Sequence, residues 1–591
     1  MRSGGVLFLA VAVMLIGGAS RLAYIQHQRG AALQARAVRQ QTASLRIPAQ
    51  RGQILDTRGR LLAGSLREPS VFVDPSLLPE PRSRHYAACS VAPTLGLDAE
   101  ELEDLIHQRS DSRFVWVKRQ ISDAELEVFN SVREGRRLYA FGVQYESLRT
   151  YPLERLAAHV LGFVGDPIEG VPRGLAGIEL SFDEQLHGTD GHRVSTVDVD
   201  RRRLRTHVNE YVPPVDGVSV VLTIDAHVQQ LAEEHLRQAV ETFKAEWGIA
   251  IAMDPQTGEV LAMANVPDFE PAQPIPPGLT PAEQHQAREC LQNKAIAHAY
   301  EPGSVFKPFI ASCALDEQIV HLDEVFHING PARAFGSRTI HDTHAYGSLA
   351  IHEVISRSSN IGMALLGGRC GNERLHDYVR RFGFGTSTAL TLPGEHDGLV
   401  QDLSRWTSYS TQSIPIGQEI AVTGIQLVTA FSCFCNGGVL YRPRIVRGIS
   451  GPAGDMLADY SEPIVVRRVL GEQSVASFRE RALVEVVMSP IGTGKNARIS
   501  NYRVFGKTGT AQVAGPRGGY LPGKYVGSFI GGAPADVPRV VVLVTLYKPA
   551  GGKYYGGTVS APAVGAILAD TLAYMQVPPE VTTGRTGGIM P

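Results

Sequence analysis

Cysteine is scarce in this chain. The 591 residues include six cysteines, Cys89, Cys290, Cys313, Cys370, Cys433 and Cys435, which are too few and too scattered to form a disulfide framework. There is no C-x-x-C pair and no cysteine–histidine cluster with zinc spacing, so we expect buried or inert thiols. Excess charge is missing as well: the net charge is −2, which gives no basis for a nucleic-acid partner.

The N-terminus has a mostly apolar run without charge, from Ser3 to Ser20. At the helical rise this run covers about 27 Å, close to the thickness of a bilayer core. It predicts a membrane anchor in residues 1–25 of a single-pass protein of the cell membrane. The positive N-terminus lies in the cytoplasm in this prediction, and the bulk of the chain lies outside. The alternative is a cleaved signal peptide with Gly18-Ala19-Ser20 as its cleavage site.

The next part of the chain, 26–216, is expected to form a stalk and a mixed pedestal domain. Residues 26–45 are polar and helix-prone, and residues 51–63 read as strand, turn and strand. Helical patterns occur at 99–107 and 123–133. The basic run at 201–205 is interpreted as a solvated face, with contact to anionic polymer or lipid head groups as the alternative.

Residues 217–576 have the pattern of an α+β domain. The first and last strands are predicted to share one antiparallel sheet, with helices on it and a helical region inserted between them. The expected strands are 218–224, 248–253, 259–264, 525–532 and 540–547, and the expected helices are 226–245 and 561–575. The remaining residues, 577–591, are rich in Pro, Gly and Thr and predict a flexible tail.

Ser304 and Lys307 stand between a Pro-Gly turn and an apolar run, in Glu301-Pro302-Gly303-Ser304-Val305-Phe306-Lys307. If a helix starts at Ser304, Lys307 lies one turn later on the same face. A serine needs an adjacent base to act as a nucleophile, and a lysine is a base only when its pKa is lowered. By itself, S-x-x-K is more often an N-capping serine and a surface lysine.

Two distant segments change this interpretation. Ser358 and Asn360 supply a hydroxyl and an amide, and the strand-like run Lys507-Thr508-Gly509-Thr510 supplies a cation and two hydroxyls beside a glycine. Cations and hydroxyls suit a carboxylate ligand, and glycine allows a close approach to the backbone. Alone each is a weak signal. S-x-x-K, S-x-N and K-T-G in this order form the motif set of penicillin-binding proteins and class A β-lactamases.

The chain therefore resembles the class B penicillin-binding proteins, the monofunctional peptidoglycan D,D-transpeptidases, and most closely their cell-division and sporulation types. The fold implied is a serine β-lactamase-like transpeptidase domain behind a dimerisation-type pedestal. Further similarities include Arg51-Gly52 to Ala63, Arg149-x-Tyr151-Pro152, Gly177-Ile178-Glu179, Gly417-Gln418, Gly492-Thr493-Gly494 and Tyr555-Gly556-Gly557. Thr57-Arg58 and Asn293-Lys294-Ala295 depart mildly from the family pattern.

The resemblance implies a role for each site residue. Ser304 is the acylated nucleophile, Lys307 its general base and Ser358 a proton relay. Asn360 binds the peptide backbone of the donor, and Lys507 lowers the pKa of Lys307 by like charge. Thr508 and Thr510, on either side of Gly509, bind the terminal carboxylate of the substrate. The implied oxyanion hole consists of the backbone N–H groups of Ser304 and Thr510.

The resemblance also implies the partners. They are D-Ala-D-Ala stem peptides as donors, amine acceptors, β-lactams, the lipid bilayer, a membrane glycosyltransferase and division proteins. No cofactor and no metal are implied; the cluster His341-Asp342-Thr343-His344 is interpreted as a loop and not as a metal site. The alternatives are an elongation-type transpeptidase, a membrane β-lactam sensor with the same fold, and a β-lactamase.

Overall fold

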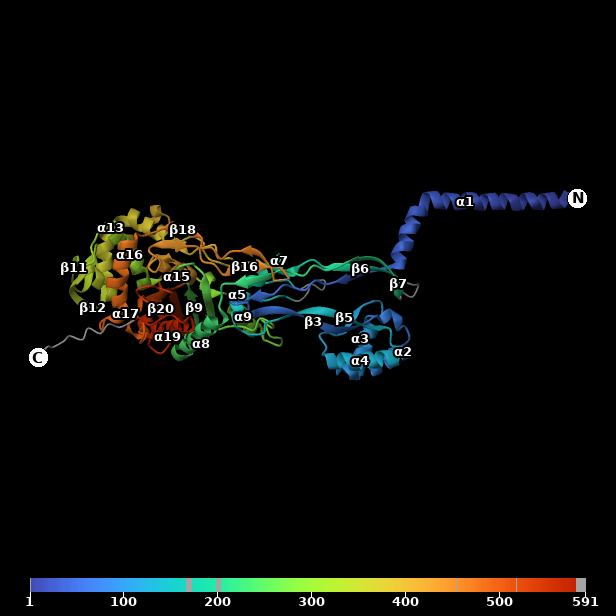
Figure 1. Ribbon diagram of the computed structural model, residues 1–591, viewed down its shortest axis with the longest axis horizontal. Coiled ribbons are helices and arrows are strands. Elements are labelled where there is room, and N and C mark those ends of the chain that lie inside the picture. Colours follow the sequence, from blue (N-terminus) through green and yellow to red (C-terminus); the bar gives the residue numbers. More distant parts are fainter. Residues whose placement is uncertain (1, 166–172, 198–202, 453, 517, 581–591) are drawn as a thin grey trace. The chain divides into compact units, whose positions relative to one another are not determined.

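The computed structural model describes residues 2–165, 173–197, 203–452, 454–516 and 518–580 (Figure 1). It divides into two compact units: unit 1 comprises 1–51, 67–148 and 187–217, and unit 2 comprises 52–66, 149–186 and 218–591. Residues 201 and 202 of the basic run 201–205, which was predicted to be a solvated face, lie outside the described residues. The predicted flexible tail lies outside them from residue 581.

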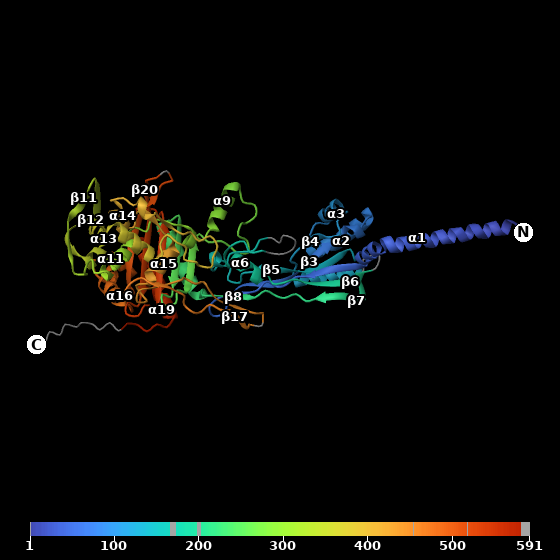
Figure 2. The same cartoon turned by 90° about the horizontal axis from the view of Figure 1, so that it is seen from above.

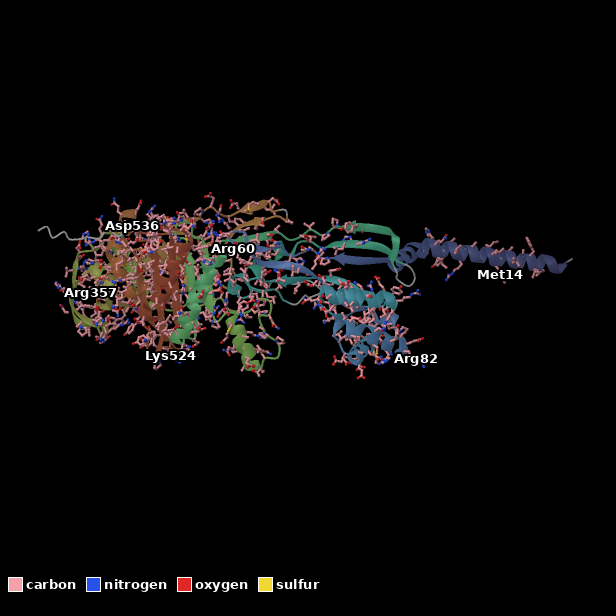
Figure 3. The ribbon with its side chains drawn as sticks, turned by 60° about the horizontal axis from the view of Figure 1, so that its bottom comes forward. Met14, Arg60, Arg82, Arg357, Lys524 and Asp536 are labelled. Atoms are coloured by element: carbon pink, nitrogen blue, oxygen red, sulfur yellow. The ribbon has the colours of Figure 1, made fainter. Side chains whose placement is uncertain are left out.

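Unit 1 begins with a long helix, α1. Its segment Gly5–Gln28 has a mean hydropathy of 2.1 and is long and apolar enough to cross a membrane. The side chain of Met14 projects from it and is 77% exposed (Figure 3). Such an exposed apolar surface fits a membrane anchor, because apolar side chains are otherwise buried.

The rest of unit 1 combines an antiparallel sheet, in the order β1-β6-β7, with helices that pack around Phe129 and Ile106. The capping box of Ser122 and Glu125 starts α4, and Asp98 caps α3. The predicted helices 99–107 and 123–133 are thereby observed as α3 and α4. The elements are α1 (Arg2–Gln41), β1 (Thr42–Ile47), η1 (Pro75–Leu77), α2 (Pro81–Val91), η2 (Ala92–Leu95), α3 (Ala99–Gln108), β4 (Val115–Lys118), α4 (Asp123–Gly135), β6 (Gly191–Val197) and β7 (Arg203–Val212); β3 (Leu61–Val73) and β5 (Phe141–Thr150) have residues in both units.

Unit 2 contains the central sheet, in the order β10-β9-β21-β20-β19, and all its neighbouring strands are antiparallel. Its elements up to the nucleophile turn are β2 (Ile54–Leu55), α5 (Ala158–Leu161), α6 (Gly177–Ser181), α7 (Asp183–His187), β8 (Ser219–Leu222), α8 (Ala226–Phe243), β9 (Trp247–Met253), β10 (Val260–Val266), α9 (Pro281–Cys290), α10 (Lys294–Ala297) and η3 (Gly303–Phe306).

The elements that follow are α11 (Lys307–Asp316), β11 (Val325–Phe335), β12 (Arg338–Ala350), α12 (Ile351–Ser356), α13 (Asn360–Arg381), β13 (Leu399–Val400), η4 (Leu403–Arg405), α14 (Ser410–Ser413), η5 (Ile414–Ile416), β14 (Ile420–Ala421), α15 (Gly424–Ser432), β15 (Val439–Tyr441), β16 (Val446–Ser450), β17 (Met456–Asp459), β18 (Val465–Arg468), α16 (Glu472–Phe478), η6 (Arg479–Leu483), α17 (Val484–Met488), η7 (Lys495–Ala497), β19 (Phe505–Ala514), β20 (Tyr520–Ala533), β21 (Val540–Tyr547), α18 (Gly556–Val559) and α19 (Ala561–Tyr574).

Helices cover both faces of the central sheet (Figure 1). Every residue of β9 is buried, as expected for a strand covered on two sides. A Cβ on Gly248 would meet Leu236 and Val240 of α8, whereas the side chain of Ile249, one residue later, lies against Gly424 at the start of α15. Because successive strand residues point to opposite faces, α8 and α15 lie on opposite sides. Of the predicted strands, 248–253 and 259–264 share this sheet with 525–532 and 540–547.

The predicted strand at 218–224 does form, but in another sheet. It is β8, which pairs with β2 in parallel and with β16 antiparallel. The segment 51–63 lies beside it as β2 and the start of β3. The sequence predicted the strand from its apolar run, but such a run carries no information on which neighbour completes the ladder.

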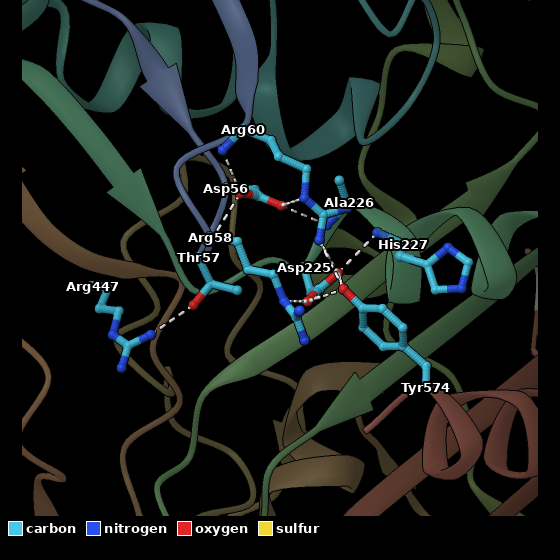
Figure 4. A network of polar contacts seen from close by, with 9 residues as sticks. All are labelled: Asp56, Thr57, Arg58, Arg60, Asp225, Ala226, His227, Arg447 and Tyr574. Atoms are coloured by element: carbon cyan, nitrogen blue, oxygen red, sulfur yellow. Dashed lines mark hydrogen bonds and ion pairs between the residues drawn. The ribbon is translucent and has the colours of Figure 1, made fainter. Parts of the chain in front are cut away.

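Asp56 fixes the turn between β2 and β3 (Figure 4). Its fully buried carboxylate accepts hydrogen bonds from the backbone N–H groups of Arg58, Arg60 and Ala226, at 2.9, 2.8 and 3.1 Å. The last of these is the first residue of α8. Asp225, just before it, accepts from the Arg58 side chain at 2.9 Å. The two aspartates therefore join the β2–β3 turn to α8.

Replacing Asp56 with alanine is expected to lower the free energy of unfolding by about 3 kcal/mol, because three backbone N–H groups lose their acceptor and Arg60 loses its ion pair with a buried carboxylate. Chemical denaturation, monitored by circular dichroism, measures this change. Asp104→Ala, at an exposed position of α3, is the control and is expected to change stability by less than about 0.5 kcal/mol. Equal effects of the two substitutions would contradict the assignment.

Candidate active site

Ser304 lies in the 3₁₀ turn η3, directly before α11. Gly303 begins this turn with a φ of 56° and donates its N–H to the carbonyl of Gly417 at 3.1 Å. The N–H of Lys307 is bonded to the Ser304 carbonyl, so the two side chains leave one continuous helical turn, as the spacing predicts. The apolar run after Lys307 is buried throughout α11 up to Ala314, which anchors this turn.

Lys307 is completely buried and bonded to the second motif segment. Its Nζ donates to the backbone carbonyl of Ser358 at 2.6 Å, to Ser358 Oγ at 3.1 Å and to Oδ1 of Asn360 at 2.7 Å. Three acceptors match the three N–H groups of an ammonium. Loss of one proton would leave a lone pair on Nζ in place of one of these bonds.

Lys507, also completely buried, approaches the same hydroxyl from the central sheet. Its Nζ donates to Ser358 Oγ at 3.0 Å and to the Thr508 carbonyl at 3.0 Å. Ser358 Oγ therefore accepts from both lysines. Ser358 itself has a φ of 60°, a backbone conformation that costs energy in a non-glycine residue and is frequent at functional sites.

Burial is the main cause of the low pKa of both lysines. It lowers the pKa of Lys307 to about 7, against an opposing effect of the Asp342 carboxylate. Burial also lowers the pKa of Lys507 well below its usual range, and the charge of Lys307 lowers it further. We predicted that the like charge of Lys507 lowers the pKa of Lys307. Desolvation lowers it instead, and the like-charge effect falls on Lys507.

The third motif lies on β19 and packs directly on the nucleophile turn. A Cβ on Gly509 would lie 2.4 Å from Cγ2 of Val305 and 3.0 Å from the carbonyl of Pro302, so only glycine permits this contact. The Thr508 hydroxyl lies 3.0 Å from that of Thr493, and the Thr510 hydroxyl accepts from the Gly556 N–H at 3.2 Å. Thr508, Gly509 and Thr510 are thus held beside Ser304.

Ser304 itself stays outside this hydrogen-bonded cluster. Among the described residues, the bonds that join Lys307, Ser358, Asn360 and Lys507 do not include its half-buried side chain. The turn brings the hydroxyl to the site without fixing it to a protein acceptor, which leaves Oγ accessible to a ligand.

Asp342 is a positioning residue that sequence reasoning did not identify. Its carboxylate accepts from Ser359 Oγ at 2.6 Å and from the Ile361 N–H at 3.1 Å, and it also accepts from the Asn360 N–H. It therefore caps the start of α13, which carries Asn360. The neighbouring His341 carbonyl accepts from the Asn360 side chain at 2.9 Å. No cluster of three metal-ligating side chains occurs in the part of the chain that the structure describes.

Replacing Asp342 with alanine is expected to lower stability by about 1–2 kcal/mol, because the N–H groups of Asn360 and Ile361 lose their acceptor and the helix loses a favourable charge. Thermal unfolding with and without a bound β-lactam measures this. The matched control is Asp323→Ala, which removes an exposed ion pair with Arg481 and is expected to cost under about 1 kcal/mol. A larger loss in the control than at Asp342 would contradict the capping role.

Comparison with known proteins places this geometry in a family. Residues 248–569 match the family described as penicillin binding protein transpeptidase domain, and residues 46–222 match the penicillin-binding protein dimerisation domain. Stage V sporulation protein D of Bacillus subtilis is 34% identical over 97% of this chain and 86% of its own length. The chain belongs to the class B penicillin-binding proteins.

A second relative and a solved structure support the same family. Peptidoglycan D,D-transpeptidase FtsI of Escherichia coli is 31% identical over 91% of this chain and 86% of its own length. A crystal structure of penicillin binding protein 3 from Mycobacterium tuberculosis, complexed with aztreonam, is 28% identical with a TM-score of 0.68, covering 91% of this chain and 98% of that one. The predicted fold class, a pedestal and a β-lactamase-like transpeptidase domain, is confirmed.

Proposed function

We propose that this chain is a peptidoglycan D,D-transpeptidase that works through an acyl-enzyme on Ser304. The observation that carries the proposal is that two buried lysines donate to Ser358 Oγ, and that one of them, Lys307, lies one helical turn from Ser304. A buried lysine that is neutral near pH 7 supplies the base that a serine nucleophile requires. Relatives named peptidoglycan D,D-transpeptidase support the assignment.

The first half-reaction breaks the peptide bond between the two terminal D-alanines of a donor stem peptide. Ser304 Oγ attacks the carbonyl carbon, and its proton passes to neutral Nζ of Lys307. The N–H groups of Ser304 and Thr510 stabilise the oxyanion. The C–N bond then breaks, a proton returns through Ser358 to the leaving nitrogen, and D-Ala departs from an ester on Ser304.

The second half-reaction forms the cross-link. The amine of a neighbouring stem attacks the ester carbonyl and loses its proton to the same relay. Ser304 Oγ leaves and regains a proton, so that the enzyme returns to its starting state. In the first half-reaction Asn360 holds the donor backbone, and the hydroxyl groups of Thr508 and Thr510 hold its terminal carboxylate. A β-lactam acylates Ser304 without releasing a fragment.

The acylation rate is expected to rise with pH through about 7, because the pKa of Lys307 is lowered to about 7 and the neutral amine is the reactive form. Stopped-flow acylation from pH 5.5 to 9 with a fluorescent penicillin measures the profile. The Asp342 carboxylate raises the pKa of Lys307, so Asp342→Asn is expected to move the profile to lower pH. A profile that falls between pH 6 and 8 would contradict the role of Lys307.

The cellular role follows from the same proposal. Helix α1 anchors the chain in the cell membrane with its N-terminus in the cytoplasm, and a membrane glycosyltransferase and division proteins are its partners. The resemblance of Leu62-Ala63-Gly64-Ser65 to the division type favours septal wall synthesis. The alternative is an elongation enzyme. A fluorescently tagged copy at the septum supports the division role, and one along the side wall supports the alternative.

The activity is tested with a fluorescent penicillin, a D-Ala-D-Ala stem pentapeptide and the chromogenic cephalosporin nitrocefin. The wild type is expected to be labelled covalently and to release D-Ala from the peptide in the presence of an acceptor amine. Ser304→Ala is expected to lose both reactions. A nitrocefin burst without turnover excludes a β-lactamase, and labelling without D-Ala release supports the sensor. Full labelling of Ser304→Ala would overturn the nucleophile assignment.

A further inference from the structure

The hairpin β11–β12 lies beside α13 (Figure 2). Its strand β12 forms hydrogen bonds with the start of α13 and with the segment 413–419. In β12, Arg338, Ile340 and Asp342 alternate in burial with their neighbours, which places them on one face of the strand. Arg338 and Asp342 are four positions apart, roughly 13 Å along an extended strand. Asp342 caps the helix that carries Asn360. Arg338 faces the segment that supports Ser304.

Arg338 binds three side chains of the segment 413–419. Its Nη2 donates to Oε1 of Gln418 at 2.9 Å, and its Nη1 donates to Oγ of Ser413 and lies 4.0 Å from Oε1 of Glu419. A planar guanidinium can hold several acceptors in a fixed arrangement. Glu419 has a φ of 64°, a conformation that the surrounding contacts have to maintain.

The segment 413–419 in turn supports the nucleophile turn at two points. The Gly417 carbonyl accepts from the N–H of Gly303 at 3.1 Å, and the Glu419 N–H donates to Oε1 of Glu301 at 3.0 Å. The other oxygen of Glu301 accepts from the Tyr520 hydroxyl at 2.8 Å, at the start of β20. The residues just before Ser304, Glu301 and Gly303, are therefore hydrogen-bonded to the segment that Arg338 binds.

We propose that Arg338 is a positioning residue for Ser304, which it holds at its working distance from Ser358 and Asn360 through Gln418, Glu419 and Glu301. The hairpin β11–β12 is the common support: one strand fixes Asn360 through Asp342 and Ser304 through Arg338. This inference rests on the proposed function, because it concerns the acylation of Ser304. In the described part of the chain, the hydrogen bonds and the ion pair of Arg338 do not include Ser304, Lys307 or Lys507.

The test separates penicillin binding from acylation by stopped-flow kinetics. Arg338→Ala is expected to reduce the first-order acylation rate about tenfold to 100-fold, the loss that a displacement of about 1 Å produces, with little change in the dissociation constant of the noncovalent complex. Arg338→Lys keeps a cation and is expected to recover part of the rate. Gln418→Ala removes one acceptor and is expected to give a smaller decrease of the same kind.

Arg333→Ala is the matched control. Arg333 lies in the same hairpin, donates to the His327 carbonyl at 2.7 Å and lies over the ring of Phe335, so the contacts described for it stay within the hairpin. Its acylation rate is expected to equal that of the wild type. An unchanged rate in both Arg338→Ala and Gln418→Ala, or an equal loss in Arg333→Ala, overturns the inference while leaving the proposed function intact. A wild type that is never acylated, or a Ser304→Ala variant that is, would instead refute the proposed function.

Discussion

Replacing Lys307 with methionine is expected to slow acylation by a β-lactam roughly 10³-fold, the usual contribution of a general base. Methionine fills the volume of the lysine stem without an amine, so the loss reports chemistry and not a cavity. Lys307 is the residue whose Nζ is bonded to both Ser358 and Asn360. Intact-mass detection of the acyl-enzyme over hours measures a rate this low.

Lys307→Arg tests the same role with the charge retained. A guanidinium does not lose its proton in proteins, so the arginine variant is also expected to be about 10³-fold slower. Thermal unfolding of both variants shows whether each is folded. Acylation of Lys307→Arg within tenfold of the wild type would contradict a base role and leave the lysine as a purely electrostatic element.

The buried lysines also show how much of the site the sequence could predict. Ser304, Lys307, Ser358, Asn360 and Lys507 were named from three motifs, and the last four are joined by hydrogen bonds in the structure. The sequence does not show that burial, and not like charge, lowers the pKa of Lys307, because burial depends on all the residues that pack around the lysine. The motifs specify which groups are present, whereas the fold determines how far these groups are buried from solvent.

Asp342 and Arg338 show why other site residues were missed. The segment 341–344 was predicted to be a loop, but it lies in β12. Asp342 stands 18 positions before Asn360, and no local pattern relates it to the helix that it caps. The pairing of β8 could not be predicted from local sequence either. Its apolar run predicted a strand, but its partners β2 and β16 come from distant parts of the chain. Long-range pairing is decided by tertiary packing.

Gly417→Ala is expected to lower the free energy of unfolding by about 3 kcal/mol and to slow acylation about 100-fold. Gly417 has a φ of 77°, and a Cβ there would lie 2.1 Å from the carbonyl oxygen of Gly303. Neither backbone segment can give way without moving the other. Since Gly303 directly precedes Ser304, relief of the clash displaces the nucleophile. Chemical denaturation and acylation kinetics measure the two effects.

A second glycine separates backbone strain from the clash. Gly394 has a φ of 82°, and a Cβ there would have no neighbour within 4 Å. Gly394→Ala therefore carries the conformational penalty alone, about 1 kcal/mol, and is expected to leave the acylation rate unchanged. If Gly417→Ala loses no more stability and no more acylation rate than Gly394→Ala, the contact between Gly417 and Gly303 does not fix the position of Ser304. A large loss of rate at Gly417 alone assigns the effect to the contact between Gly417 and Gly303, and hence to the position of the Ser304 hydroxyl.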